Sequence, residues 1–181
     1  MLATLVNACW AATLASVLGL DDVVFANINN GRSATVRNVL NVAGPCINPV
    51  PYRVRFEGPP RASDVLESLS SQYLSALNHD DVHPFALSPE VTKWPAGTHP
   101  TSMLIMQMQN PNAAFEMAGE KLELNTEERM WAQVPFSAAV FPTPAGDTLI
   151  VACQRNQLYV DHELGEKLSV AWVNRLREFS A

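Results

Sequence analysis

The spacing of apolar residues changes from a helical to a strand-like period along the chain, and this change restricts the fold more than any other feature. Near the N-terminus the apolar side chains recur every three or four positions, which predicts an amphipathic helix that ends at Gly19. Residues 52–56 instead alternate between apolar and arginine side chains, as in a strand with one face in water. Pro49 and Pro51 at its start predict either a sheet edge or the point where the strand enters the sheet, because proline cannot donate to the hydrogen-bond ladder. The expected apolar face of the helix comprises Leu2, Leu5, Val6, Cys9, Trp10, Thr13, Leu14, Val17 and Leu18.

Further patterns extend this mixture of helices and strands to the end of the chain. Apolar runs at 23–25 and 102–110 predict strands, and the segment 136–154 predicts a hairpin. Ser63 and Asp161 are suitable N-caps for two more helices. The expected apolar faces of these helices comprise Leu66, Leu69, Tyr73, Leu74 and Leu77 in the first, and Leu164, Leu168, Trp172, Leu176 and Phe179 in the second. The whole order predicts an α/β fold, in the sense of an α+β sandwich, with one mixed sheet and helices on one face.

Two segments lack a regular period. Residues 31–45 predict a long ordered loop, a kind of segment that often carries function. Residues 110–130 are polar and predict a hairpin or a loosely attached stretch.

Composition and charge exclude several classes of partner. The 181 residues carry a net charge of −6 without a cluster of lysine and arginine, so we expect no nucleic-acid partner. The apolar N-terminus has no basic flank and is interrupted by polar residues such as Asn7, which argues against a signal peptide and against a membrane span. Three distant cysteines, Cys9, Cys46 and Cys153, predict buried free thiols in a reducing compartment. We therefore expect a cytoplasmic protein without a membrane partner.

The chain shows no complete catalytic or metal-binding pattern. His79 and His83 are four residues apart, but Pro84 and the two aspartates between them disfavour the helix that a metal site would need. No phosphate-binding glycine loop, dinucleotide fingerprint or nucleophile elbow is present. We expect no catalytic residue and no metal ligand in this chain.

Several segments, taken in order, resemble the second half of the condensation domains of nonribosomal peptide synthetases. Gly31 and Arg32 match the end of the family's Ser-Gly-Arg turn. Further matches fall at Gly44, Asn48, Pro51 and Arg53, which form the most specific group, and at His79, Pro84 and Phe85. The resemblance covers essentially the whole chain, and the sequence Gly-Pro-Cys-Ile-Asn at 44–48 favours a fungal synthetase.

The resemblance implies one half of a chloramphenicol-acetyltransferase-like fold, with residues 1–181 as the C-terminal subdomain of a condensation domain. Residues 32–44 would form the floor loop beneath the substrate tunnel, and residues 110–133 the latch that crosses to the other subdomain. The implied tunnel or carrier-binding residues are Asn29, Arg32, Gly44, Asn48 and Gln107. Asn29, Arg32 and Asn48 also suit purely structural roles, such as stabilising a turn or an ion pair.

The implied function is that of the acceptor-side half, in a domain that forms amide bonds between thioesters held by carrier proteins. The phosphopantetheine arm belongs to those carriers, and we expect no cofactor bound directly to this chain. The family's His-His-x-x-x-Asp-Gly motif belongs to the missing N-terminal subdomain and is absent here, so we expect the chain alone to be inactive. A free-standing, non-catalytic carrier-binding module and a part of a terminal cyclisation domain are the alternatives.

Overall fold

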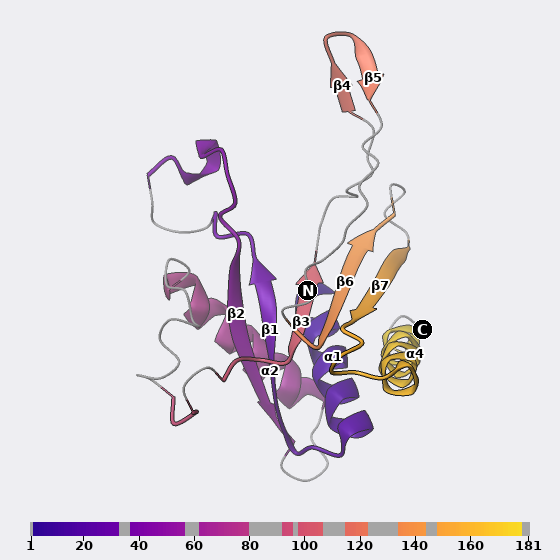
Figure 1. The fold of residues 1–181 in the computed structure, drawn as a ribbon. Helices are drawn as coiled ribbons and strands as arrows, with labels where there is room; N and C mark the ends of the chain where they lie inside the picture. Colours follow the sequence, from indigo (N-terminus) through magenta and orange to yellow (C-terminus); the bar gives the residue numbers. More distant parts are fainter. Residues whose placement is uncertain are drawn as a thin grey trace.

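The computed structural model shows a five-stranded sheet covered on one face by helices (Figure 1). It describes residues 2–32, 37–56, 62–79, 92–95, 98–106, 115–122, 134–143 and 148–178. The strands of this sheet are β1 (Asp22–Asn29), β2 (Asn48–Arg55), β3 (Ser102–Met106), β6 (Phe136–Pro142) and β7 (Leu149–Arg155). The helices are α1 (Leu2–Leu18), α2 (Ala62–Ala76) and α4 (His162–Glu178), with short 3-10 turns η1 (Val39–Asn41) and η2 (Leu77–His79).

The sheet is mixed, with the strand order β2-β1-β3-β6-β7. The central pairs β1–β3 and β3–β6 are parallel, and the outer pairs β1–β2 and β6–β7 are antiparallel. A parallel neighbour requires a long crossover, and α2 lies in the connection that carries the chain from β2 to β3. The predicted order of elements, the mixed sheet and the single helical layer are all confirmed.

The core lies between the sheet and the helices and is built around Trp10 of α1. Its ring stacks on Phe136 at a centroid distance of 5.4 Å and meets Trp172 of α4 edge-on at 5.1 Å. Its indole nitrogen donates a 2.8 Å hydrogen bond to Ser102 Oγ at the start of β3. A buried tryptophan needs such an acceptor, so this contact fixes α1 over the centre of the sheet.

α1 is enclosed more fully than the amphipathic helix that we expected. It lies between α2 and α4 and against β1, so the whole stretch from Val6 to Leu14 is buried except for Ala12, which is half-buried. The expected apolar face was wrong at its two ends, where Leu2 and Leu18 are exposed. Gly19 follows the helix with φ of 67°, the left-handed conformation predicted for its end.

α2 differs from the expectation at both ends. The helix begins at Ala62, so Ser63 lies inside the first turn, and its hydroxyl bonds to Asp64 Oδ1 rather than capping the helix. Leu69 is buried, but Tyr73 and Leu74 are exposed, so the predicted apolar face is too long. Near this end of the helix Ala76, rather than Tyr73 or Leu74, packs against the core.

α4 follows its prediction closely. Asp161 Oδ1 accepts a 2.8 Å hydrogen bond from the backbone N–H of Leu164, which is the predicted N-cap. Leu168 and Trp172 are buried, and Leu164 and Leu176 pack against the core from its edge. Phe179 lies outside the described residues.

β2 forms one edge of the sheet, which is one of the two positions that its prolines predicted. Val50, Tyr52 and Val54 are buried, and the arginines between and after them are exposed. The side-chain amide of Gln72 from α2 pairs with the free edge: it accepts from Arg53 N at 3.0 Å and donates to Arg53 O at 2.9 Å. This pairing shields part of an edge that could otherwise recruit another strand.

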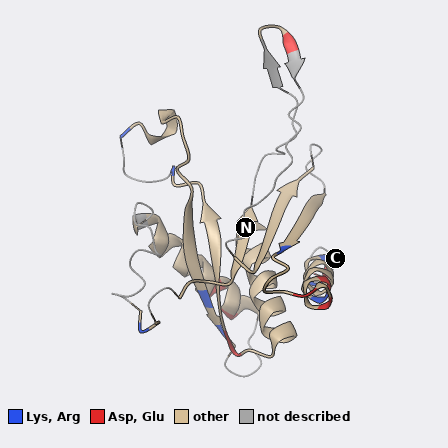
Figure 2. Cartoon of the chain, viewed as in Figure 1, with Lys and Arg blue, Asp and Glu red and all other residues tan. Residues whose placement is uncertain are grey.

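Two segments project beyond one end of the sheet, the described residues 30–32 and 37–47 between β1 and β2, and a separate hairpin of β4 (Phe115–Met117) and β5 (Glu120–Leu122) (Figure 1). Ala118 and Gly119 form the hairpin turn with φ of 56° and 83°, as in the primed turns that suit the twist of strands. The hairpin expected within 110–130 is therefore confirmed. Figure 2 shows charged residues mainly at the opposite end of β1 and β2 and along α4.

Candidate functional site

A cavity of about 370 Å³ lies where β1 and β3 end, beside the N-terminal turns of α1 and the C-terminal end of α2. The carboxyl ends of neighbouring parallel strands often form ligand sites, because the elements that follow them diverge there. Its polar lining comprises Asn7, Asn27, Asn29, Asn30, Arg32, Tyr52 and Tyr73, and its apolar lining comprises Ala3, Ile28, Leu40, Leu77 and Met106. We name this cavity the amide pocket, after its four asparagines.

Two buried asparagines tie the helix to the sheet inside the amide pocket. Asn27 faces α1 from β1, and its Nδ2 donates a 2.6 Å hydrogen bond to Asn7 Oδ1. Both residues are buried although they lie among apolar neighbours. Buried amides are normally retained only where hydrogen bonds satisfy them, so this pair marks a position with a specific role.

The loop that borders the pocket is held in place by Arg32. The guanidinium donates from Nη1 to the carbonyls of Val39 and Val42, at 2.8 and 2.9 Å, and from Nη2 to that of Gly44, at 2.9 Å. Its backbone N–H also donates to Asn30 Oδ1 at 3.0 Å. Arg32 therefore organises the loop from within, and its positive charge faces carbonyl oxygens.

Gly31 fixes where this loop returns to the sheet. Its φ of 60° lies in the left-handed region, which favours glycine. A Cβ atom at this position would also collide with the carbonyl oxygen of Cys46, which comes just before β2. Only glycine allows the two ends of the loop to approach so closely.

The structure brings together most of the residues implied by the family resemblance. Asn29 and Arg32 line the amide pocket, and Gly44 accepts a hydrogen bond from Arg32. Asn48 is buried and lies opposite Asn29 in the β1–β2 ladder, but it is not among the lining residues. Gln107 lies outside the described residues.

Sequence reasoning missed Asn7, Asn27, Tyr52 and Tyr73 as pocket residues. One signal was available: Asn7 interrupts an apolar helix and Asn27 interrupts an apolar strand, and polar residues at core positions require partners. Tyr73 was assigned to a buried helix face because its spacing suits one, yet it lies beyond the core at the pocket.

The described lining favours hydrogen bonding over proton transfer or covalent chemistry. It contains no histidine, cysteine, aspartate or glutamate. Elsewhere, burial raises the pKa of the Cys9 thiol to about 11 and also raises that of Cys153, so neither is a thiolate near neutral pH. All three cysteines are free thiols, but only Cys9 is buried as expected; Cys46 and Cys153 are half-buried. Among the described residues no cluster of three or more potential ligands could hold a metal ion.

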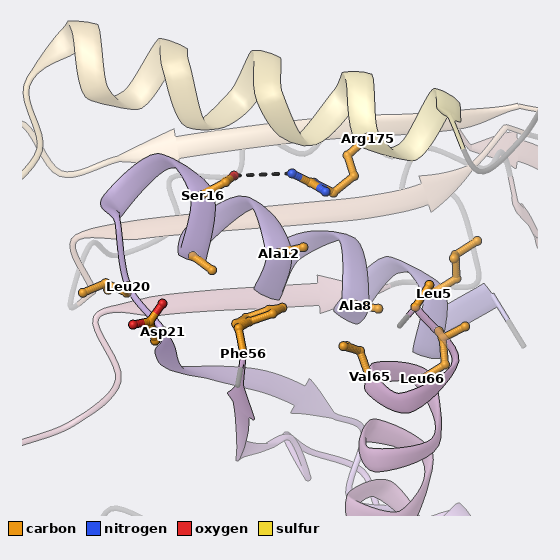
Figure 3. A pocket seen from close by; sticks show the side chains of 12 residues that line it. Leu5, Ala8, Ala12, Ser16, Leu20, Asp21, Phe56, Val65, Leu66 and Arg175 are labelled. Carbon is orange, nitrogen blue, oxygen red and sulfur yellow. Dashed lines mark hydrogen bonds between the residues drawn. The ribbon is translucent and has the colours of Figure 1, made fainter. Parts of the chain in front are cut away.

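A second cavity, of about 410 Å³, lies in the helical layer between α1 and α2 (Figure 3). Its walls are mainly Leu5 and three alanines of α1, the apolar side chains of Ala62, Val65 and Leu66 from α2, and Phe56. Arg175 reaches over α1 and bonds to Ser16 Oγ at 3.4 Å (Figure 3). This cavity offers shape and apolar surface but few polar groups, so the amide pocket is the stronger candidate for specific binding. No helix in the described parts of the chain is long and apolar enough to cross a membrane.

Comparison with known proteins relates this architecture to fungal enzymes. The nonribosomal peptide synthetase opaA of Aspergillus ustus is 31% identical over 169 residues, which is 92% of this chain and 4% of that protein. The nonribosomal peptide synthetase TES of Alternaria alternata is 28% identical over 172 residues, 93% of this chain and 3% of that protein. The chain thus spans only a few per cent of the curated relatives it matches. No protein-family model matches it.

Solved structures give the same answer for the fold. The protein solved as holo T3CT is 26% identical, with a TM-score of 0.79, over 99% of this chain and 41% of that one. The first condensation domain of the CDA synthetase superposes with a TM-score of 0.68 at 18% identity, over 98% of this chain and 38% of that one. Together with the fungal relatives, these matches show that the chain is similar in sequence to nonribosomal peptide synthetases and has the fold of their condensation domains.

Proposed function

We propose that the chain is the acceptor-side, C-terminal subdomain of a condensation domain, and that it works only with an N-terminal subdomain. In the complete domain an acceptor amine attacks the thioester carbonyl of the donor. A C–N bond forms, the C–S bond breaks, and the carrier thiol leaves. The amine proton must be accepted by a base, and the described lining of the amide pocket holds no group suited to this.

The observation that carries the proposal is the extent of the structural match. The whole chain superposes on about two fifths of solved chains, several of which are named as condensation domains. A missing N-terminal portion would supply the remainder of the tunnel and the His-His-x-x-x-Asp-Gly motif. Carrier proteins with phosphopantetheine arms are then the partners that deliver both thioesters.

The projecting segments support this arrangement. We assign the floor loop to 32–44 and the latch to 110–133, whose described part is the β4–β5 hairpin. Both project beyond the same end of the sheet in Figure 1, where a second subdomain could engage them. The tunnel or carrier-binding residues of this proposal are Asn29, Arg32, Gly44, Asn48 and Gln107.

The helix-free face of the sheet also suits a partner. Because Asn27 faces α1, the next residue Ile28 faces away from the helices. The strand register continues this row through Ile105, Ala139 and Ala152. Ile150 shares the face and is exposed. No described helix covers this row, but Ala139 within it is buried, so the exposed apolar part is its outer end at Ala152 and Ile150. Such an exposed end would suit a partner.

The test supplies donor and acceptor carriers loaded with thioesters to the chain alone and to the chain mixed with the N-terminal subdomain encoded upstream of it. We expect an amide product, measured by mass spectrometry, only in the mixture. An alanine in place of the second histidine of the added motif should abolish the product. Product from the chain alone, or none from the mixture, would contradict the proposal. Carrier binding without product in the mixture would instead favour the free-standing binding module.

A further inference from the structure

We propose that Asn7 and Asn27 together bind a secondary amide group of the ligand that enters the amide pocket. The pair is a hydrogen-bonded unit that leaves a donor of Asn7 and the acceptor of Asn27 unused, and both residues line the pocket. The binding chemistry follows from the pocket itself, and only the source of the amide rests on the proposed function.

The hydrogen-bond capacity of the pair is incompletely used. An asparagine side chain offers two N–H donors and a carbonyl acceptor. Asn27 Nδ2 donates to Asn7 Oδ1 at 2.6 Å, and within the described residues neither Asn7 Nδ2 nor Asn27 Oδ1 has a partner. Asn7 is only 6% exposed and Asn27 only 7%, so these groups have little contact with bulk water.

The two unused groups remain open to the cavity. Among the described residues, the enclosed side-chain atoms without a hydrogen-bond partner are Trp172 Nε1 and Arg175 Nε, both on α4. Asn7 Nδ2 and Asn27 Oδ1 are therefore accessible, and both residues line the amide pocket. The remaining exposed area of the pair is thus where a ligand would lie.

This arrangement matches an amide better than an ester or an ion. A secondary amide can accept from Asn7 Nδ2 and donate to Asn27 Oδ1, whereas an ester lacks the donor and leaves Asn27 Oδ1 unpaired. Arg32 is the one charged residue in the described lining, and the loop carbonyls already occupy its guanidinium. The pocket thus selects a neutral ligand through hydrogen bonds.

A purely structural role explains the pair less well. A contact that only tied α1 to β1 could be apolar, as it is for Trp10 and Phe136 a short distance along the same helix. If polar, it would be expected to satisfy both amides within the protein. The open donor and acceptor indicate a ligand. Its amide comes either from the pantetheine arm of a carrier or from the peptide bond of the carried group.

The experiment titrates the ¹⁵N-labelled chain with three probes while the side-chain amide signals of the asparagines are followed by NMR. The probes are pantetheine, N-methylacetamide as the model of one peptide bond, and methyl acetate, in which an ester oxygen replaces the amide N–H. We expect the signals of Asn7 and Asn27 to shift with at least one amide probe, and the ester to bind about 5- to 10-fold more weakly than its amide counterpart, the equivalent of one hydrogen bond. A response to pantetheine alone assigns the carrier arm, and a response to the peptide probe alone assigns the carried group.

The matched variants are Asn7→Asp and Asn174→Asp. The first keeps the acceptor for Asn27 but removes the donor offered to the ligand, so amide binding should weaken by a similar factor. The second changes an exposed asparagine of α4 and should leave binding unchanged. Equal binding of ester and amide by the native chain, or no shift of the two signals with either amide, would overturn the inference. The comparison of amide with ester binding needs no catalysis. Amide binding can therefore fail while the amide-forming assay with the mixture succeeds, and it can succeed while that assay fails.

Discussion

Helix α1 passes from an open polar pocket to a closed aromatic core within four residues. Asn7 faces the amide pocket with a donor unused, whereas the single donor of Trp10 is satisfied by Ser102. Both side chains are buried and both join the helix to the sheet. The difference shows how one helix can serve two purposes. The paired indole of Trp10 stabilises the fold, and the unpaired amide of Asn7 beside the cavity is available to bind a ligand.

The largest effect is expected when the aromatic core around Trp10 is disrupted. Trp10→Ala removes the stacking on Phe136, the edge contact with Trp172 and the bond to Ser102, and should lower the free energy of unfolding by about 3–5 kcal/mol. Urea unfolding followed by circular dichroism measures this change. Leu158→Ala, at a residue 85% exposed, should stay within about 0.5 kcal/mol of the native chain. A loss below about 1 kcal/mol for Trp10→Ala would show that the core is centred elsewhere.

The next effect tests the loop that borders the pocket. Gly31→Ala should destabilise the protein by about 2–4 kcal/mol, because the left-handed conformation and the collision with the Cys46 carbonyl add together. Gly19→Ala is the matched control: its φ is 67°, but no atom lies within 4 Å of the added Cβ, so about 1–2 kcal/mol is expected. Equal losses in the same urea experiment would mean that the loop does not return as closely as the structure shows.

A smaller and more local effect concerns Arg32. Arg32→Gln removes the three hydrogen bonds from the guanidinium to loop carbonyls, while the core is untouched. We expect faster amide hydrogen exchange at Asn41 and Val42, and a change in global stability below about 1 kcal/mol. Arg37→Gln changes an exposed arginine of the same loop and should leave this exchange unaltered. If these amides exchanged at the native rate in the Arg32 variant, Arg32 would not be the residue that holds the loop in place.

The smallest effect lies far from the pocket, at the charged end of β1. Hydrogen bonds from Arg53 hold the pKa of Asp22 below its usual value. A depressed carboxyl pKa stabilises the folded state above the unfolded pKa, near 4, and this contribution disappears as the pH falls through the folded pKa. Asp22→Asn should therefore be slightly less stable than the native chain at pH 7, with the difference vanishing in acid and shrinking in high salt. A difference that is as large in acid as at pH 7 would not come from this ion pair.

Local patterns were sufficient wherever one element decides its own structure. The Asp161 cap and the turn at Gly19 were predicted from a few adjacent residues, and the edge position of β2 was one of the two that its prolines predicted. The predictions failed where an element far away in the sequence determines whether a side chain is buried. The middle of α1 is buried on most sides because α2 and α4 flank it, whereas Tyr73 is exposed although Ala76, three residues later in α2, still packs against the core.

The candidate site was predictable only in part for the same reason. Asn29 and Arg32 were found through a family resemblance that follows the chain, and both line the pocket. Asn7 and Asn27 carry no motif, and their pairing joins residues 20 positions apart that lie on different elements. Each asparagine alone reads as a tolerated polar residue, and only the fold shows that the two act together.

The most direct test of the central claim is the size and composition of the native protein in its source organism. Immunoblotting with an antibody against this chain, followed by peptide sequencing of the species purified under native conditions, measures both. If the chain is half of a condensation domain, it will be found with a His-His-x-x-x-Asp-Gly segment, either in one much larger polypeptide or in a stable complex. A species with the mass of this chain alone and without a companion that carries that motif would contradict the claim that it is half of a condensation domain.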